Sequence, residues 1–477
     1  MQRSTKIVAT LGPASSDAAV LRPLLAAGVD VVRMNFSHGT AQDHLARAEL
    51  VRDISRELGL TVGIMCDLQG PKIRIGKFDS GRITLEAGAR FILDARCNLG
   101  DQERVGLDYR ELPNDVRSGD VLLLDDGRIV LDVVAVQGSE IQTIVRHGGE
   151  LSNNKGINRQ GGGLTAPALT AKDMEDIRTA AAMKADFLAV SFPKSGSDMY
   201  MARELMRAAG GRAFLIAKIE RAEAVRALED ILDASDGIMV ARGDLAVEVG
   251  DAAVPALQKR MIRLAREKNR LAITATQMME SMISSPVPTR AEVSDVANAV
   301  LDGTDAVMLS AETAAGRYPV QTVEAMSRVC LEAEKSDELR LDLEFLDRVF
   351  TRVDQSIAMG ALFTAFHLKV KCIAALTQSG STALWMSRLH CGVPIYALTP
   401  EVSTRYRMSL FRDVYPLMIE NYTPERDALL REAEDALKAH GAVQDGDLIV
   451  LTIGEPIGKS GGTNTLKIVR VGEHRPA

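Results

Sequence analysis

The sequence has few cysteines, and their spacing excludes several kinds of site. Five occur among 477 residues, and no two lie at the short spacing of a zinc site or a dithiol redox motif. Their odd number and their positions in apolar runs indicate reduced core thiols, as in a cytoplasmic protein. They are Cys66, Cys97, Cys330, Cys372 and Cys391.

Long apolar runs and an excess of positive charge are also missing. No apolar run reaches the ~20 residues of a membrane span, and Met1–Lys6 is too polar for a signal peptide, so we expect a cytoplasmic location and no membrane partner. A net charge of −7 and a pI near 5.7 argue against a nucleic-acid partner. An anionic substrate would have to be attracted by local basic groups.

Apolar, strand-like runs recur along the chain with helical patterns between them, and nearly every run ends in polar or glycine-bearing residues. Eight strands, each followed by a helix, indicate the α/β class and a (β/α)₈ TIM barrel. The runs are Lys6–Leu11, Val29–Phe36, Thr61–Leu68, Phe187–Phe192, Phe214–Ile219, Gly237–Ala241, Leu271–Ala275 and Ala306–Leu309.

The third and fourth runs are separated by more sequence than one helix needs. Runs such as Arg82–Leu85, Val121–Leu124 and Arg128–Val136 alternate apolar and polar residues and are typical of antiparallel hairpins. We therefore expect a small β-barrel domain at 75–163, inserted into a barrel of 1–74 and 164–340. Its position after a barrel strand suits a lid.

Another alternation of strands and helices follows the eighth unit and indicates an open α/β domain at 341–477. Its expected strands are Cys372–Leu376, Pro394–Leu398, Asp413–Ile419 and Asp447–Thr452.

Two short runs place charged residues where barrel strands end, AKIE at 217–220 and VARGDL at 240–245. We expect one helix at Ala222–Leu232 between the two strands that these runs end, so Glu220 and Asp244 follow consecutive parallel strands, on the face where barrel enzymes carry out chemistry. Two carboxylates suit Mg²⁺, with Mn²⁺ as the alternative, because the ion keeps positions for substrate oxygens. Lys218 supplies a point charge for an anionic substrate. The alternative is two loop carboxylates and a solvated lysine.

Several of these runs resemble the successive motifs of the pyruvate kinase family, bacterial type. They are TKIVATLGPASS at 5–16, RMNFSHG at 33–39, DLQGPKIR at 67–74, AKIE at 217–220, MVARGDL at 239–245, ITATQMMESMISSPVPTRAEVSDVANAV at 273–300 and Met308–Thr313. The likeness implies phosphoryl transfer from phosphoenolpyruvate to ADP in glycolysis, giving pyruvate and ATP, with Glu220 and Asp244 holding the metal.

The resemblance also assigns the groups that act on phosphoenolpyruvate. Lys218 and Arg33 would neutralise charge on the transferring group and the enolate. The backbone of Gly243 and Asp244 would seat the carboxylate at a helix start. Thr276 would relay the proton to the enolate carbon, helped by Ser310 or water. Without the resemblance, Thr276 reads as a helix cap.

The nucleotide-binding residues rest on the resemblance alone. Asn35, His38 and Arg74 would face the ADP phosphates, and Lys155 would reach down from the insert. Otherwise His38 reads as a capping or core histidine. Gly461-Gly462-Thr463 lacks the spacing of a P-loop. Asp126 reads as part of a hairpin turn rather than a contact of the nucleotide's metal.

One departure from the family concerns potassium. Most members carry threonine, lysine and glutamate where this chain has Leu68, Gln69 and Lys72. Asn35, Ser37 and Asp67 match the family's other potassium ligands, but Leu68 removes a hydroxyl. Lys72 brings a fixed unit charge, so we predict that potassium is not required. Neutral drift is the alternative.

A hydroxyl-rich run after Cys372–Leu376 opens a helix expected at Ala383–Leu389. Its residues Thr377, Ser379, Gly380, Ser381 and Thr382 could seat a phosphate or form only an N-cap cluster. In the family the corresponding loop binds a sugar-phosphate activator, and a loop resembling Gly458–Thr465 closes on it. The resemblance implies activation by a sugar phosphate or AMP, and a homotetramer.

Two rival functions remain at this stage. A Mg²⁺-dependent lyase or aldolase could use the same carboxylate pair but would not need Lys155. A catalytically dead sugar-phosphate sensor would not need Lys218, Thr276, Glu220 and Asp244 intact.

Overall fold

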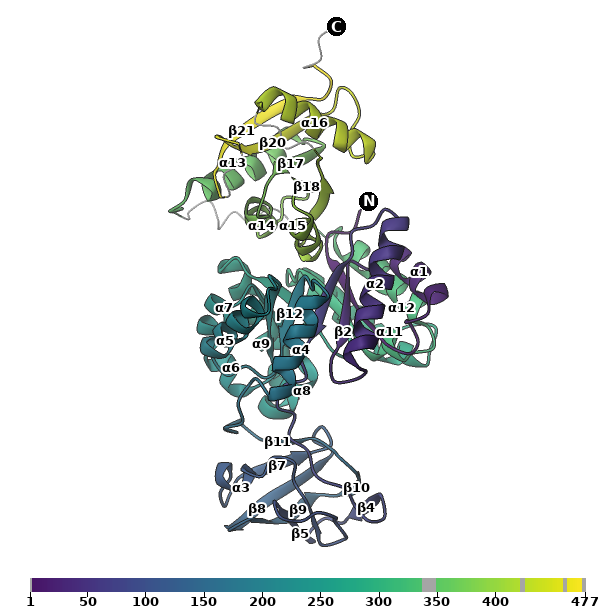
Figure 1. Ribbon diagram of the computed structural model, residues 1–477, viewed down its shortest axis with the longest axis vertical. Helices are drawn as coiled ribbons and strands as arrows, with labels where there is room; N and C mark the ends of the chain where they lie inside the picture. The colour runs from purple at the N-terminus through teal and green to yellow at the C-terminus, as the bar shows by residue number, and fades with distance from the viewer. Residues whose placement is uncertain (1, 337–348, 421–424, 458–460, 474–477) are drawn as a thin grey trace.

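The computed structural model describes residues 2–336, 349–420, 425–457 and 461–473. Figure 1 shows three bodies in a row: the barrel in the middle, the inserted region at one end and the C-terminal region at the other. The expected boundary at 340/341 and part of the loop 458–465 lie outside the described residues.

The barrel closes in the order β1-β16-β15-β14-β13-β12-β3-β2, with every neighbouring pair parallel. The predicted (β/α)₈ barrel is confirmed, because buried apolar runs of four to six residues form all eight strands. The strands are β1 Lys6–Leu11, β2 Val31–Asn35, β3 Gly63–Asp67, β12 Phe187–Val190, β13 Phe214–Ile219, β14 Gly237–Ala241, β15 Leu271–Ala275 and β16 Ala306–Leu309.

Helices surround this barrel, and three of them begin with capping boxes at Thr40, Thr170 and Thr289. The single helix expected at Ala222–Leu232 is wrong, because the backbone at Ala227 (φ −93°, ψ 18°) divides it in two. The helices are α1 Ala18–Ala26, α2 Ala41–Glu57, α4 Ala171–Ala182, α5 Gly196–Ala208, α6 Ala222–Arg226, α7 Leu228–Ala234, α8 Arg242–Val249, α9 Val254–Glu267, α10 Arg290–Leu301, α11 Ala311–Ala314 and α12 Pro319–Ala333.

The inserted region is built of hairpins, but its described strands form two sheets rather than the expected closed small barrel. A Cβ at Gly148 would lie 2.1 Å from the carbonyl oxygen of Leu85, so only glycine lets the chain leave one sheet for the other there. The six-stranded sheet has the order β11-β7-β8-β9-β5-β6, and β4 pairs with β10. The elements are β4 Arg82–Leu85, β5 Arg90–Asp94, β6 Arg104–Val105, α3 Leu112–Asp115, β7 Val121–Leu124, β8 Ile129–Gln137, β9 Glu140–His147, β10 Gly149–Ser152 and β11 Ile157–Arg159.

The C-terminal region is an open sheet in the order β19-β18-β17-β20-β21. The four predicted strands are present, but the sequence reading missed β21, which is antiparallel to β20 and in which only Thr463 and Val469 are buried. The hydroxyl oxygens of Thr382 and Thr463 lie 2.6 Å apart and link the hydroxyl-rich loop to β21. The elements are α13 Val353–Leu368, β17 Cys372–Leu376, α14 Ser381–Ser387, β18 Ile395–Thr399, α15 Val402–Arg407, β19 Val414–Met418, α16 Arg426–Ala439, β20 Leu448–Gly454 and β21 Thr463–Arg470.

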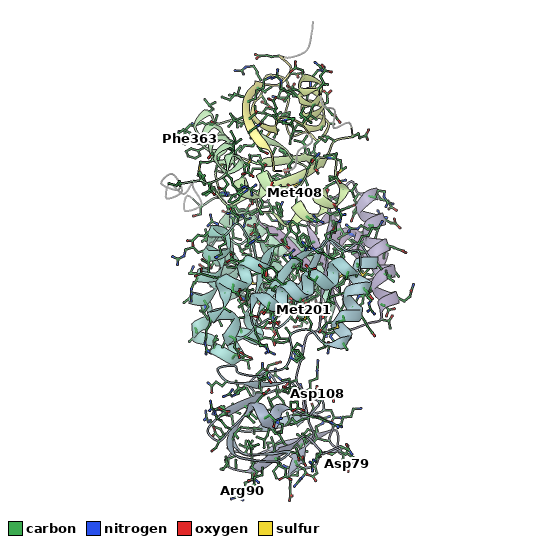
Figure 2. All side chains as sticks on the ribbon, turned by 60° about the vertical axis from the view of Figure 1, so that its left-hand side comes forward. Asp79, Arg90, Asp108, Met201, Phe363 and Met408 are labelled. Atoms are coloured by element: carbon green, nitrogen blue, oxygen red, sulfur yellow. The ribbon has the colours of Figure 1, made fainter. Side chains whose placement is uncertain are left out.

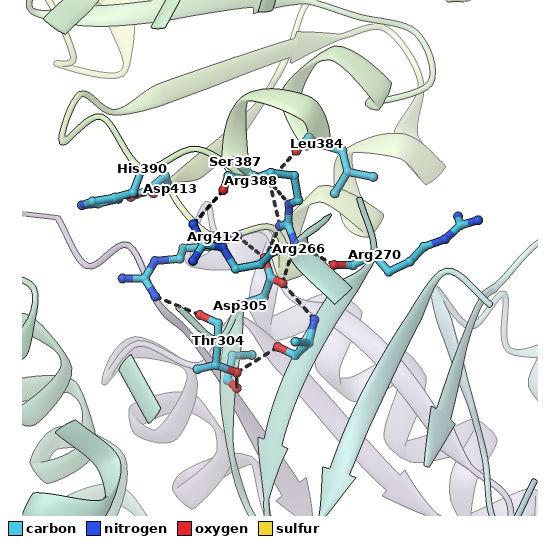
Figure 3. Close-up of polar contacts among 12 residues, drawn as sticks. Arg266, Arg270, Thr304, Asp305, Leu384, Ser387, Arg388, His390, Arg412 and Asp413 are labelled. Atoms are coloured by element: carbon cyan, nitrogen blue, oxygen red, sulfur yellow. Dashed lines mark hydrogen bonds and ion pairs between the residues drawn. The ribbon is translucent and has the colours of Figure 1, made fainter. Parts of the chain in front are cut away.

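A buried ion pair joins the C-terminal region to the barrel (Figure 3). Arg388, which follows α14, donates through both terminal nitrogens to Asp305 at the start of β16. The backbone amides of Ala272 and Arg412 also donate to this carboxylate. Since both partners are almost fully buried, the pair ties α14 to the amino end of the barrel. In the described residues, no helix is both long and apolar enough to span a bilayer.

Candidate active site

Charged side chains from three strands meet at the carboxyl end of the barrel. Lys218 lies 2.9 Å from the Oε1 of Glu220 and 3.3 Å from the Oδ1 of Asp67, and its ammonium donates to the Ser191 hydroxyl at 2.8 Å. Arg33 donates through Nε to the Oδ2 of Asp67 at 2.6 Å. The predicted residues Lys218, Glu220, Arg33 and Asp67 are thus brought together as two cations alternating with two carboxylates.

Burial and mutual charge shift the pKa values in this cluster. Burial acts to lower the pKa of Lys218, but Asp67 and Glu220 raise it overall, so the ammonium stays charged. Burial acts to raise the pKa of Asp67, yet Arg33 and Lys218 lower it overall. Burial raises the pKa of Glu220 to about 7 against the pull of Lys218, and the nearby charge of Asp244 raises it further.

The Asp244 carboxylate is the uncompensated charge of the site. It lies in the first turn of α8, half-buried, and forms no ion pair or side-chain hydrogen bond within the described ranges. Glu220 is held by Lys218 and by the Phe192 amide, which donates to its Oε2 at 2.8 Å. Hard carboxylate oxygens at adjacent strand ends, with repulsion between them, fit a divalent cation such as Mg²⁺. The described residues contain no cluster of three or more acidic, histidine or cysteine side chains suited to a metal, so substrate or water would complete the shell.

Thr276 sits in a strained backbone segment beside this carboxylate. Thr276 and Gln277 have φ values of +67° and +53°, a region that costs non-glycine residues about 1–3 kcal/mol. The Thr276 hydroxyl accepts from the Gly243 amide at 2.9 Å and donates to the carbonyl of the preceding residue at 2.7 Å. The Arg242 guanidinium donates to the Thr276 carbonyl at 2.6 Å and pairs with Asp295 at 2.7 Å. Arg242 therefore holds the strained segment in place.

Ser310 is not joined to Thr276 by a hydrogen bond between their hydroxyls in the described structure. It lines a separate cavity of about 660 Å³ together with three other predicted residues, Arg33, Asn35 and His38. His38 is exposed there, so it is not a core histidine, and Thr40 rather than His38 caps α2. The remaining lining residues are Thr10, Leu11, Gly12, Pro13, Gly39, Arg47, Ala311, Ala314 and Ala315.

A second cavity of about 640 Å³ lies between α8 and the inserted region, and Lys72 and Asp244 both line it. The other lining residues are Leu123, Asp126, Gly127, Gln160, Gly243, Ala246, Val247, Gly250, Asp251 and Gln277. Lys155 and Arg74 line neither cavity: Lys155 pairs with Asp125 at 2.7 Å, and Arg74 donates to the Asn154 carbonyl at 3.2 Å. The structure therefore separates them from Asn35 and His38. In Figure 2, Asp108, which accepts from the Arg74 amide, lies on the barrel side of the insert, and Arg90 at its far end.

The residues predicted to replace a potassium site lie in two groups. Asn35 and Asp67 are register partners on β2 and β3, and the Asn35 Oδ1 accepts from the Ser37 amide at 3.1 Å. Leu68 is 1 % exposed and packs in the apolar core, so it offers no side-chain ligand. Lys72 faces the cavity of Asp244 and does not line the cavity of Asn35.

The predicted effector loop forms a tight hydroxyl-lined turn. The Gly380 amide donates to the Thr377 hydroxyl at 2.9 Å, and the Ser379 and Ser381 hydroxyls lie 3.1 Å apart. Gly380 has a φ of +82°, which a side chain would strain. The helix begins at Ser381, two residues earlier than predicted, because the hydroxyl-rich run forms its first turn.

Sequence reasoning missed three polar residues of this site. Ser191 anchors the Lys218 ammonium, Arg242 holds the Thr276 segment, and Arg47 lines the cavity of Asn35. Arg242 stood inside the quoted VARGDL run, so its motif was a signal. Ser191 and Arg47 carried no signal, because a serine after a strand and an arginine on an amphipathic helix are ordinary.

Comparison with known proteins places this site in a family. The barrel-domain model of pyruvate kinase matches residues 2–323, and the family's alpha/beta-domain model matches residues 355–469. Pyruvate kinase II of Salmonella typhimurium is 53% identical over 475 residues, covering 98% of this chain and 99% of that protein. The Haemophilus influenzae pyruvate kinase is 53% identical over 458 residues, 95% of this chain and 96% of its own. The Mycobacterium tuberculosis pyruvate kinase is 42% identical, covering 99% of both chains. A match over nearly the whole chain, with a charged cluster at the barrel mouth, means that this phosphotransferase belongs to the pyruvate kinase family.

Proposed function

We propose that this enzyme transfers the phosphoryl group of phosphoenolpyruvate to ADP, giving pyruvate and ATP in glycolysis, with the chemistry at the Lys218 cluster. The observation that carries the proposal is the buried ammonium of Lys218 between Asp67 and Glu220, beside the unpaired carboxylate of Asp244. Phosphoryl transfer depends mostly on positioning and charge neutralisation, and a fixed buried cation supplies both.

Lys218 and Arg33 would neutralise the transferring phosphoryl group and the enolate that it leaves. Both cations are already oriented by Asp67, so little reorganisation is needed when substrate enters. The Gly243 and Asp244 backbone would seat the carboxylate of phosphoenolpyruvate.

Proton transfer to the enolate carbon would use the Thr276 hydroxyl. That hydroxyl is oriented by the Gly243 amide, and Arg242 fixes its backbone. Ser310 lies in the neighbouring cavity, so its contribution would pass through water.

Glu220 and Asp244 would hold Mg²⁺, with Mn²⁺ as the alternative. Such an ion would act as a Lewis acid and neutralise charge on the substrate's oxygens. Burial and the charge of Asp244 raise the pKa of Glu220, and a divalent cation beside it would favour its ionised form.

Asn35 and His38 would contact the ADP phosphates in the 660 Å³ cavity, whose volume suits a nucleotide. Lys155 would reach those phosphates only if the inserted region, taken as 75–163 between barrel segments 1–74 and 164–340, moved toward the barrel as a lid. Arg74, the last barrel residue before it, would follow because its backbone bonds to Asp108 and Gly156 of that region. The Lys155–Asp125 pair would then have to open.

Potassium would not be required. Leu68 offers no ligand, and Lys72 is a half-buried cation that lines the same cavity as Asp244, where it would serve as a fixed charge for substrate phosphates.

A sugar phosphate or AMP would activate the enzyme from the C-terminal domain, 341–477, at the loop Thr377–Thr382. Hydroxyls and a free helix start there suit a phosphate group. A homotetramer is the family's assembly, and α13 offers it apolar surface: Phe363, marked in Figure 2, is 44% exposed.

A coupled assay of pyruvate formation from phosphoenolpyruvate with and without ADP tests the main proposal. We expect turnover only with ADP and a divalent cation. Pyruvate formed at equal rates without ADP would instead indicate phosphoryl transfer to water and would overturn the proposal, whereas no pyruvate with any metal would favour the lyase or the sensor. Ser379→Glu/Ser381→Glu tests the effector loop: its basal rate should persist, and activation by fructose 1,6-bisphosphate, ribose 5-phosphate or AMP should be lost.

A further inference from the structure

A third cavity, of about 520 Å³, lies where the barrel meets the C-terminal region. Its walls are the end of α5, the loop that follows, the first residues of β13, and Arg407 at the end of α15. Figure 2 labels Met408, the residue after Arg407, at this junction. The cavity is at the amino end of β13, opposite the end that carries Lys218. It is lined by Arg203, Met206, Arg207, Gly210, Gly211, Arg212, Ala213, Phe214, Leu215 and Arg407.

Four arginines and no carboxylate line this cavity, in a chain whose net charge is −7. Arg203 and Arg207 are compensated from outside it: Arg203 pairs with Asp236 at 3.0 Å, and Arg207 with Glu204 at 2.9 Å. The uncompensated positive charge of the cavity therefore comes from the other two arginines, Arg212 and Arg407.

Arg212 and Arg407 have no carboxylate within ion-pair distance in the described residues. The Arg407 guanidinium donates to the backbone carbonyl of Arg212 at 2.6 Å and lies 4.9 Å from the centre of the Phe214 ring. Burial lowers the pKa of Arg407 and the charge of Arg212 lowers it further, while Asp186 and Asp236 oppose this. Two cations from different parts of the chain therefore face one space without a shared counter-charge.

The cavity has a firm wall and a size suited to a small metabolite. The Phe214 ring stacks on the Phe411 ring and meets the Phe187 ring edge-on, with 6.5 Å between ring centroids in both pairs, so neighbouring rings hold it in place. Guanidinium groups bind phosphate and carboxylate oxygens through paired hydrogen bonds. Volumes of roughly 300–1,000 Å³ are typical of ligand sites.

We propose that this cavity binds a small polyanion, a phosphorylated or polycarboxylate metabolite, that joins Arg407 of the C-terminal region to Arg212 of the barrel. The bound anion supplies the missing counter-charge and so strengthens the contact between the two bodies. The site is separate from the active-site cluster and from the loop Thr377–Thr382.

Calorimetric titration of the full chain without divalent metal tests the site, with pyrophosphate as the phosphate probe and citrate as the carboxylate probe. Sodium chloride at equal ionic strength controls for screening. Arg212→Gln and Arg407→Gln should each weaken the binding of at least one probe about tenfold, the loss of one charge-assisted contact. Arg178→Gln, at an exposed arginine of α4 outside the cavity, should bind as the wild type does.

Arg212→Glu gives an independent readout, since its carboxylate can pair with Arg407. We expect a higher melting temperature than wild type without anion, and no further rise with the probe that stabilises wild type. A response to pyrophosphate alone identifies a phosphate site, and one to citrate alone a carboxylate site. Unchanged affinity for both probes in Arg212→Gln, or in Arg407→Gln, overturns the proposal, whatever the kinase assay shows.

Discussion

The two ends of β13 differ in whether the protein supplies a counter-charge for their positive side chains. At the carboxyl end, Lys218 lies between Asp67 and Glu220, and the protein supplies its own counter-charge. At the amino end, Arg212 and Arg407 share a cavity with no lining carboxylate. A cation that is neutralised in place is already oriented for a transition state. The unneutralised pair lacks a counter-charge, which an anionic ligand would supply.

The largest effect should come from removing the neutralised cation. Lys218→Met should lower kcat about 10³-fold, roughly 4 kcal/mol in the barrier, because its charge matters most in the transition state. Steady-state kinetics of pyruvate formation would check this, with KM for phosphoenolpyruvate changing far less. A near-normal kcat would remove Lys218 from the chemistry. Arg212→Gln, at the other end of β13, should leave kcat without effector within twofold.

A buried, fully paired arginine at the same junction offers the next contrast. Arg388→Met should destabilise the protein by about 3 kcal/mol, because it leaves the Asp305 carboxylate buried without its cation. Thermal unfolding at a fixed scan rate measures this. Arg56→Met is the matched control: its pair with Asp53, 3.0 Å apart, is exposed on both sides and should contribute under 1 kcal/mol. Equal destabilisation by Arg388→Met and Arg56→Met would show that burial does not make the Arg388–Asp305 pair more important for stability.

Lys72 resembles the unneutralised arginines, because it faces a cavity without an ion pair in the described residues. Lys72→Glu should lower kcat/KM about 10²-fold, roughly 2.7 kcal/mol, through repulsion of substrate phosphates. Potassium should partly restore that variant, and more so with Leu68→Thr added. For the wild type, rates in tetramethylammonium and potassium salts of equal ionic strength should agree. A tenfold rise of the wild-type rate on adding potassium would show that Lys72 does not replace the charge of the ion.

Glu248 is the converse case, a buried carboxyl whose charge is poorly compensated. Burial raises its pKa to about 7 and Glu223 adds to this, so the folded state favours the protonated form. The tighter proton binding in the folded state therefore adds fully to the free energy of unfolding below the unfolded pKa of about 4.5. This contribution is lost as the pH rises through 7. Glu248→Gln should raise stability by about 2 kcal/mol at pH 8 and by almost nothing at pH 4.5. A pH-independent difference in melting temperature would contradict this.

Much of the fold could be predicted from local pattern. Residues Gly237–Ala241 form a strand with the bounds expected, because a fully buried strand needs an uninterrupted apolar run. The failures occur where local pattern is silent. Ala227 divides a helix that amphipathicity alone would continue, and β21 has only two buried residues, so it lacks an apolar signature. In the site, the hydrogen bond from the Gly243 amide to the Thr276 hydroxyl depends on the positive φ angles of Thr276 and Gln277. Neither residue type predicts a positive φ.

By itself the sequence determined where barrel strands run and which charged residues stand at their ends, because strand alternation puts Lys218 and Glu220 on one side of β13. Only the tertiary structure decided which charges meet. Barrel closure brings Asp67 to Lys218, and the docking of the C-terminal region brings Arg407 to Arg212, 195 positions away. Pairing energy depends on distance and burial, and neither is set until distant segments pack together.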